Sequence, residues 1–276
     1  MTTSPMEARR RAAQALAAIR AQRPLVHHIT NFVVMNDTAN VTLQVGALPV
    51  MAHAREEVAE MVAMAGALVL NIGTLTPDWV EAMLEAGRRA NASGIPVILD
   101  PVGAGATTLR TQSARRLLSE LRVRVVRGNA GEIGALYGTG GIVKGVESLG
   151  GVDDPVSLAR QAARAWGTVV AITGKRDIVT DGSRVLGVDN GHPYLTTLTG
   201  TGCMSTTMVA AFAAVEPDGV MAAAGALACF GLAAEWAAQQ ARGPGSCKLA
   251  LLDALHRLGP EDLEQGARIE VVAGEI

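Results

Sequence analysis

Short apolar runs rich in β-branched residues alternate with longer Ala-rich stretches over much of the chain. The apolar runs have the length of strands and lie at 24–29, 47–51, 67–72, 95–100, 122–128 and 167–173. The stretches between them have the length of helices and lie at 30–45, 55–65, 76–92, 109–121, 129–138 and 153–165. Because this alternation is typical of βαβ units, it predicts an α/β fold with a mainly parallel sheet buried on both faces.

The two ends of the chain follow different patterns. An Arg-rich opening, residues 1–22, predicts an amphipathic helix rather than a transit peptide, because it contains Glu7 and lacks a Ser-rich tract. The dipeptide Asp181-Gly182 separates two short apolar runs and favours a hairpin turn. After residue 200, Ala-rich stretches predict helices almost to the end of the chain. No linker or repeat interrupts the pattern, so we expect one domain over 1–276.

Composition excludes several classes of function. Hydrophobic residues make up 49% of the 276 residues, enough for a large core. The sequence contains no uninterrupted apolar run of about 18 residues, which argues against a membrane span. A net charge of −2, 3% aromatic residues and no basic stripe argue against nucleic acid as a partner. The three cysteines are odd in number and lack zinc-site spacing, which favours a reducing cytoplasm.

Five loops follow the predicted strands and are rich in Gly, Thr, Asp or Asn. They read NIGTLTPD, LDPVGAGATT, RGNAGEI, ITGKRD and TLTGTGC. Ligands of a parallel α/β sheet bind beyond the carboxyl ends of its strands. We therefore expect the functional site at these loops.

The last of these loops has the features of an anion site. Gly200, Thr201 and Gly202 allow close backbone approach, and the following helix adds the positive end of its dipole. The loop is neither a Walker A nor a Rossmann sequence: TGKR at 173–176 lacks the earlier glycine and the hydroxyl, and GTGCMS comes late without a third glycine. An ordinary turn before a buried helix is the alternative.

Two acidic positions could hold Mg²⁺. Asp100 ends a predicted strand, and Glu132 lies three residues after Asn129, on the same face of a helix. Mg²⁺ prefers carboxylate and water oxygens, so these carboxylates would hold it largely through water. For Glu132 alone, a charge that complements the helix dipole is the simpler interpretation.

The remaining polar residues at the predicted strand ends allow two interpretations each. Arg127 follows an apolar run and could bind a phosphate or form a surface ion pair. Thr173 and Lys175 could flank a nucleotide or solvate a turn. His27 and His28 are too close in sequence to form a helical metal-ligand pair, which favours structural roles.

Taken together and in order, these segments resemble hydroxyethylthiazole kinase. The similarity runs from Pro24 to Phe212 and is most specific in HHITNFVVMNDTAN. RGNAGEI and GTGC resemble the wider ribokinase-like superfamily, which carries an N-x-x-E motif and a G-x-G-D loop. The resemblance implies a three-layer α/β sandwich, and phosphoryl transfer from ATP, with Mg²⁺, to the alcohol of 4-methyl-5-(2-hydroxyethyl)thiazole in thiamine salvage. It also implies a homotrimer with sites at subunit interfaces.

The resemblance assigns the thiazole site residue by residue. Met51 and Gly200 match thiazole-binding positions, and Asn31, Val33 and Gly73 line the pocket. From its residue type alone, Met51 could equally be a core residue, and Asn31 a helix cap.

The resemblance also assigns the phosphate side of the site. Arg127 and Thr173 match ATP-binding positions, and Asp100 and Glu132 fall in the magnesium–phosphate network. Cys203 lies where most relatives have the Asp that accepts the hydroxyl proton.

Cys203 is therefore expected to act as proton acceptor or positioner, without a covalent intermediate. A thiol at a helix N-terminus can have a lowered pKa, whereas a nearby phosphate acts the other way. Three alternatives remain open: a hydroxymethylpyrimidine or pyridoxal kinase, an ATP-dependent dehydratase on the same fold, and a non-catalytic nucleotide-binding regulator. The first usually retains Asp where this chain has Cys203.

Overall fold

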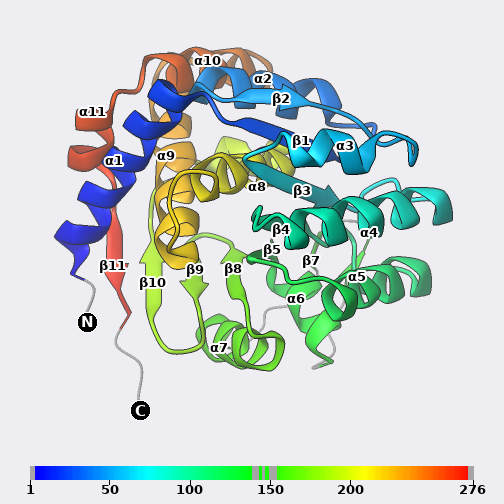
Figure 1. Ribbon diagram of the computed structural model, residues 1–276. Coiled ribbons are helices and arrows are strands. Elements are labelled where there is room, and N and C mark those ends of the chain that lie inside the picture. The colour runs from blue at the N-terminus through cyan, green and yellow to red at the C-terminus, as the bar shows by residue number, and fades with distance from the viewer. Residues whose placement is uncertain (1–3, 139–142, 145–146, 149–153, 273–276) are drawn as a thin grey trace.

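The computed structural model describes residues 4–138, 143–144, 147–148 and 154–272. A nine-stranded sheet forms its centre (Figure 1). β2, β1, β3, β4, β5 and β8 run parallel, and β9, β10 and β11 each pair antiparallel with the preceding strand. The predicted mainly parallel sheet is confirmed. In order across the sheet, the strands are β11 (Ile269–Val271), β10 (Val185–Val188), β9 (Asp177–Thr180), β8 (Val169–Thr173), β5 (Val125–Asn129), β4 (Val97–Asp100), β3 (Ala67–Asn71), β1 (Leu25–Ile29) and β2 (Leu48–Val50).

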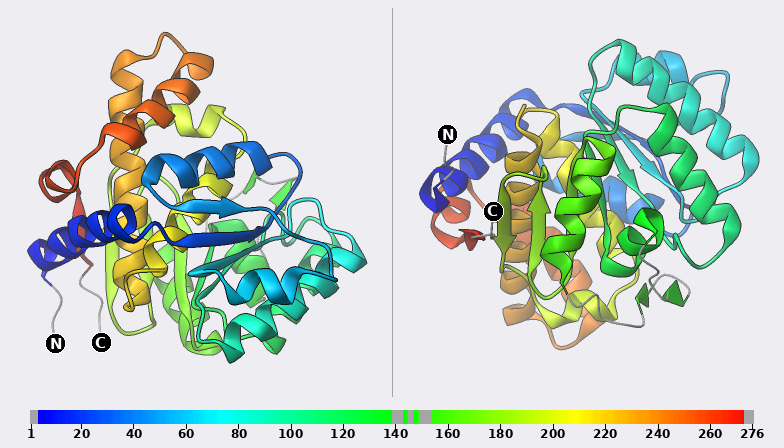
Figure 2. Two further views of the ribbon diagram at one scale, coloured as in Figure 1. Left: turned by 45° about the horizontal axis from the view of Figure 1, so that its top comes forward. Right: turned by 90° about the horizontal axis from the view of Figure 1, so that it is seen from below.

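Helices cover both faces of the sheet and complete three layers (Figures 1 and 2). The helices that build the core of one face are α1 (Pro5–Gln22), α2 (Met35–Val45), α8 (Thr201–Ala213), α9 (Gly219–Gln240), α10 (Pro244–Arg257) and α11 (Pro260–Gly266). Those that build the core of the other face are α3 (Val58–Ala63), α4 (Pro77–Ala92), α5 (Thr108–Glu120), α6 (Ala130–Tyr137) and α7 (Pro155–Trp166). A 3₁₀ turn, η1 (Pro193–Thr197), precedes α8. Two short strands, β6 (Val143–Lys144) and β7 (Glu147–Ser148), follow α6 and pair antiparallel.

Side chains along each strand point alternately to the two faces of the sheet. This alternation divides the core in two and sets the direction of the polar side chains at the strand ends. Val69 and Ile98 belong to the core under α8, whereas their neighbours Leu70 and Leu99 belong to the core of the opposite face. The next residues, Asn71 and Asp100, return to the α8 face, because side chains of a strand alternate with a period of two. These two residues pair in register across β3 and β4.

Local signals place the helix ends. Asp154 caps α7 by accepting hydrogen bonds from the backbone N–H groups of Val156 and Ser157, and Pro155 occupies the first helical position. α7 ends at Gly167, which adopts the left-handed conformation with φ of 63°.

Three sequence predictions of secondary structure were wrong in part. The helix expected at 30–45 begins only at Met35, because Asn31 Oδ1 accepts the Val33 N–H and holds the preceding residues in a loop. The strand expected from 122 begins at Val125. The C-terminal segment expected to be helical includes β11, whose Ile269 is buried where it pairs with β10.

One helix, α9, has the length and composition of a membrane span. α9 is long and apolar enough to cross a membrane, with a mean hydropathy of 1.6, but 89% of that stretch is buried inside the fold. α9 therefore packs as a core helix. The predicted hairpin is confirmed: β9 and β10 pair antiparallel around Asp181, which accepts hydrogen bonds from the Ser183 and Arg184 N–H groups.

Candidate active site

The polar residues singled out in the sequence gather at the carboxyl edge of the parallel strands. Asp100 ends β4, Arg127 lies in β5 and Thr173 ends β8. The N-terminus of α8 reaches the same edge, because Thr206 in its second turn donates a hydrogen bond to Asp100 Oδ2 at 2.8 Å. The location expected for a ligand of a parallel α/β sheet therefore holds the charged residues.

The first turn of α8 is open to an anion. Its N-cap, Gly200, has φ of 87° and provides no side-chain cap. A Cβ atom at Gly200 would lie 2.7 Å from Val34 Cγ1, so a glycine is required there for space as well as for conformation. Backbone N–H groups at an uncapped helix start favour a bound phosphate.

Arg127 provides a cation beside this helix start. Its guanidinium donates a hydrogen bond to Thr173 Oγ1 and packs against Gly202 of α8. Its Nε atom is buried and has no hydrogen-bond partner among the described residues. The guanidinium therefore retains capacity for a phosphate oxygen, which it can bind through more than one N–H group.

Asp100 is 1% exposed and uses only one of its carboxylate oxygens. Oδ2 accepts hydrogen bonds from Asn71 Nδ2 and Thr206 Oγ1, both at 2.8 Å, whereas Oδ1 is buried without a partner in the described part of the chain. Burial raises the pKa of Asp100, and the nearby charge of Arg127 acts in the opposite direction. An unpartnered buried carboxylate oxygen of this kind fits a magnesium ligand, directly or through water.

Glu132 has a structural role as well as a place near Asp100. It forms a capping box with Asn129, and its Oε1 accepts a hydrogen bond from the Gly103 N–H at 2.8 Å. Burial, and secondarily the charge of Asp100, raises the pKa of Glu132 to about 7. Among the described residues no group of three His, Cys, Asp or Glu side chains could hold a metal.

Cys203 is a buried thiol in the first turn of α8. Its Sγ lies 3.2 Å from Asn71 Nδ2 and 3.5 Å from Asn31 Nδ2. Burial, and after it the charge of Asp100, raises the pKa of Cys203 to about 12. Of the two influences expected on this thiol, a helix N-terminus that lowers its pKa and a negative group that raises it, the second acts here together with burial.

The predicted thiazole-site residues divide into buried and exposed ones. Asn31 is 4% exposed, and a Cβ atom at Gly73 would lie 2.6 Å from Asn31 Nδ2, so these two residues are in contact. Met51 follows β2 at the same edge of the sheet and is half-buried. Val33 is 62% exposed and does not close a pocket within one chain. Gly200 packs against Val34.

Two residues of the site were missed in the sequence. Asn71 and Thr206 both contact Asp100, and Asn71 also contacts Cys203. Asn71 carried a usable signal, because it ends a predicted strand, as Asp100 does. Thr206 lies three residues after Cys203, on the same helix face.

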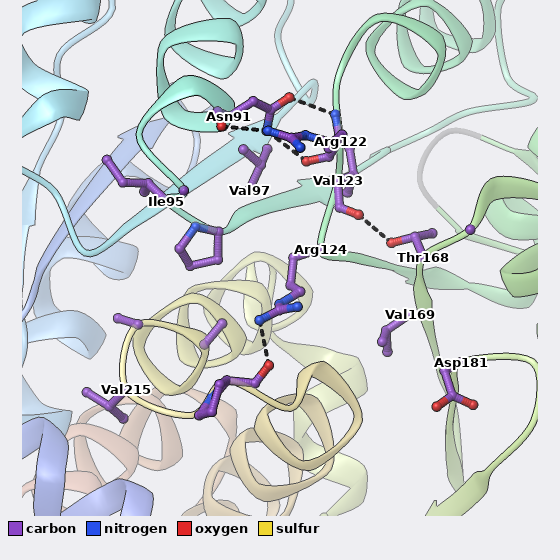
Figure 3. Close-up of a pocket in the computed structure, with 16 residues that line it drawn as sticks. Asn91, Ile95, Val97, Arg122, Val123, Arg124, Thr168, Val169, Asp181 and Val215 are labelled. Atoms are coloured by element: carbon purple, nitrogen blue, oxygen red, sulfur yellow. Dashed lines mark hydrogen bonds between the residues drawn. The ribbon is translucent and has the colours of Figure 1, made fainter.

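A hollow of about 650 Å³ lies at the opposite edge of the sheet (Figure 3). It is bordered by the amino ends of β4, β5 and β8, and its polar groups are used within the chain. Thr168 donates a hydrogen bond to the Val123 carbonyl at 2.6 Å, and Arg122 donates one to the Asn91 carbonyl at 2.7 Å. The carboxyl edge, with its unpartnered polar atoms, is therefore the better candidate for chemistry.

Comparison with known proteins shows the family to which the chain belongs. The model of the hydroxyethylthiazole kinase family matches residues 16–261. A hydroxyethylthiazole kinase from Desulforudis audaxviator is 68% identical over 264 residues, covering 96% of this chain and 97% of its own. One from Roseiflexus sp. is 69% identical over 254 residues, covering 92% of this chain and 94% of its own.

Solved structures extend the agreement to the fold. The structure of a hydroxyethylthiazole kinase protein from Pyrococcus horikoshii matches with a TM-score of 0.88 at 46% identity, covering 95% of this chain and 99% of that one. A ribokinase-like superfamily protein from Enterococcus faecalis matches with a TM-score of 0.60 at 15% identity, covering 92% of this chain and 83% of that one. The second likeness concerns the fold alone, and confirms the ribokinase-like sandwich. The chain belongs to the hydroxyethylthiazole kinase family and is a phosphotransferase.

Proposed function

We propose that this chain, acting as one domain, transfers the γ-phosphoryl group of ATP to the hydroxyl of 4-methyl-5-(2-hydroxyethyl)thiazole. The observation that carries the proposal is the meeting of Arg127, Asp100 and Cys203 around the uncapped first turn of α8. This arrangement supplies a cation for the phosphates, an acid for magnesium and a side chain for the acceptor alcohol.

ATP binds, in this proposal, with its phosphates between α8 and β5. Arg127 and Thr173 are the nucleotide-binding residues, and the unpartnered Nε of Arg127 supports a phosphate contact. The first-turn N–H groups of α8 face the same phosphates and stabilise the charge that spreads over them during transfer.

Asp100 and Glu132 would hold Mg²⁺, chiefly through water. The free Oδ1 of Asp100 supports this assignment. Both oxygens of Glu132 already accept backbone N–H groups, which favours a water-mediated contact there. Bound Mg²⁺ would neutralise phosphate charge, and this chain's residues would hold its shell in place.

The thiazole ring would bind between Met51, Gly200, Asn31, Val33 and Gly73. Asn31 is fixed by its neighbours, since its Oδ1 accepts the Val33 N–H and its Nδ2 donates to Asn71. The polarisable thioether of Met51 suits a flat heterocycle.

Cys203 occupies the proton-acceptor position and acts mainly by positioning the hydroxyl. Its raised pKa keeps the thiol protonated at neutral pH, which disfavours early deprotonation of the alcohol. Early deprotonation is not needed, because the transition state of phosphoryl transfer is loose. The bond between the attacking oxygen and phosphorus is only slightly formed in it. The proposal includes no covalent cysteine intermediate.

A homotrimer with sites at its interfaces accounts for the exposed rim of the thiazole pocket. Phe32 and Val33 are each 62% exposed and directly follow the buried Asn31. Two adjacent apolar side chains at a site's edge suit coverage by a second copy of the chain. Light scattering of the protein, and of a Val33→Glu variant, tests this: the variant should dissociate and raise the KM for thiazole. A monomeric wild type contradicts the trimer.

We place the protein in the cytoplasm, where its three free, buried thiols would stay reduced. The function is tested by incubating purified protein with ATP and Mg²⁺, with and without hydroxyethylthiazole, and detecting the phosphate ester by mass. Thiazole-dependent ester formation that stops on addition of EDTA supports the proposal. Phosphorylation of a hydroxymethylpyrimidine or pyridoxal alcohol instead would overturn the substrate, and ATP hydrolysis without any ester would favour a dehydratase.

A further inference from the structure

Asn71 ends β3 and lies between Asp100 and Cys203, yet the proposed chemistry gives it no task. Its side chain is 1% exposed. Nδ2 donates to Asp100 Oδ2 at 2.8 Å and to Cys203 Sγ at 3.2 Å, and Oδ1 accepts from Asn31 Nδ2 at 2.8 Å and from the Gly73 N–H at 3.0 Å. The amide thus uses both of its donor hydrogens and both of its acceptor lone pairs.

Two backbone groups fix the direction of this network. A backbone N–H can only donate, so the atom of Asn71 that faces the Gly73 N–H must be the oxygen. The Val33 N–H fixes the oxygen of Asn31 in the same way. Both amide nitrogens therefore point toward Cys203, and the assignment does not depend on a choice between amide flips.

The network has consequences for both side chains that it reaches. The Cys203 sulfur accepts N–H groups from Asn31 and Asn71, so its own hydrogen points away from both amides, and the Asp100 carboxylate is its neighbour on that side. Asp100 Oδ2 accepts from Asn71 and Thr206, which leaves Oδ1 as the oxygen available for other contacts. One amide group therefore orients the thiol and selects the free oxygen of the acid.

We propose that Asn71 is a positioning residue for phosphoryl transfer, which holds the Cys203 sulfur at a fixed place relative to the Asp100 carboxylate. The inference rests on the proposed function, because the place of the sulfur matters only if it meets the acceptor hydroxyl. The register of β3 and β4 makes Asn71 suitable for this role, since Asn71 and Asp100 are paired directly across the sheet.

The test compares Asn71→Ala with Thr206→Val. Both residues are buried and donate to the same oxygen of Asp100 at 2.8 Å, but only Asn71 also contacts Cys203. Asn71→Leu, which keeps a similar volume, loses all four hydrogen bonds and adds no charge beside Asp100, provides a second variant in case Asn71→Ala fails to fold. Cys203→Ala and the double variant with Asn71→Ala complete a mutant cycle.

Asn71→Ala and Asn71→Leu should lower kcat by about 10- to 100-fold, the usual cost of losing a residue that orients an active-site ligand. The KM for ATP should change less than about threefold, since Asn71 touches none of the nucleotide-binding residues. Thr206→Val should lose less than Asn71→Ala. The double variant should be about as active as the poorer single variant, because Asn71 acts through the sulfur.

Three results would overturn the inference. The first is a kcat loss in the Asn71 variants that only follows their folded fraction, measured by circular dichroism. The second is a double variant in which the two single losses multiply fully, and the third is a Cys203→Ala variant that keeps kcat within about threefold of wild type. Failure of the proposed function looks different. If the proposed function is wrong, the wild-type protein itself forms no thiazole phosphate, before any Asn71 variant is compared with it.

Discussion

The Arg127 guanidinium packs directly against the backbone of Gly202: a Cβ atom at Gly202 would lie 2.7 Å from Arg127 Nη1. The second position of α8 must therefore be small for the arginine to keep its place. This contact joins the helix start to the cation, so the two elements proposed to bind the same phosphates depend on each other.

Gly202→Ala should weaken ATP binding without unfolding the protein. The added methyl group displaces the guanidinium, so we expect the KM for ATP to rise about tenfold, equivalent to about 1.4 kcal/mol. Stability should hold or improve, because alanine is favoured over glycine in helices by up to about 1 kcal/mol. Gly245→Ala is the matched control: Gly245 is also the second residue of its helix, and a Cβ atom there meets nothing within 4 Å. Equal ATP KM values for the two variants would contradict the prediction.

Glu132 should lower the stability of the ligand-free protein as the pH rises. Its pKa is about 7 in the folded state and about 4.5 when unfolded, so the folded state binds more protons between these values. The contribution of Glu132 to the free energy of unfolding should therefore fall between pH 4.5 and 7, by up to about 3 kcal/mol. Chemical denaturation of wild type and Glu132→Gln across this range measures the slope. The variant should lack this fall, even if its overall stability is lower because glutamine cannot accept both N–H groups. Parallel curves would contradict the raised pKa.

His28 should act in the opposite direction. It is fully buried beside Thr42, and burial lowers its pKa from 6.5 to about 3. The unfolded state then binds more protons between pH 3 and 6.5, so stability falls as the pH drops through this window. Between pH 6.5 and 4.5 we expect wild type to lose about 2 to 3 kcal/mol more than His28→Asn. Because Glu132 and His28 act in opposite directions between pH 4.5 and 6.5, and burial also shifts the pKa values of Asp100, Asp177 and His27, each effect is measured as the difference between wild type and its variant.

Sequence patterns predicted the sheet and most of its charged edge because both follow from local chemistry. Apolar runs of strand length mark buried parallel strands, and a charged residue at a strand end, such as Asp100, points to the ligand edge. Arg127 and Thr173 were expected on separate strands, and the structure brings them into hydrogen-bonding contact.

What the sequence could not provide depends on contacts between distant segments. The direction of the pKa shift of Cys203 stayed open, because burial beneath Asn31 and Asn71 is a tertiary property that the sequence of the helix N-terminus does not reveal. The strand β11 was missed since three residues carry little periodicity, and its pairing with β10 joins segments far apart in the chain.

Replacing the thiol by the carboxylate usual in related kinases tests the role of Cys203. Cys203→Asp should remain a working kinase, with kcat within about tenfold of wild type, because a loose transition state demands little from the proton acceptor. The new carboxylate could accept the N–H groups of Asn31 and Asn71 that now face the sulfur, although the charge of Asp100 lies nearby. Cys247→Ala, in the core at α10, serves as a control that should leave turnover unchanged. If Cys203→Asp folds, binds ATP and yet forms no thiazole phosphate, the thiol has a task that a carboxylate cannot perform, and the positioning role proposed for it is wrong.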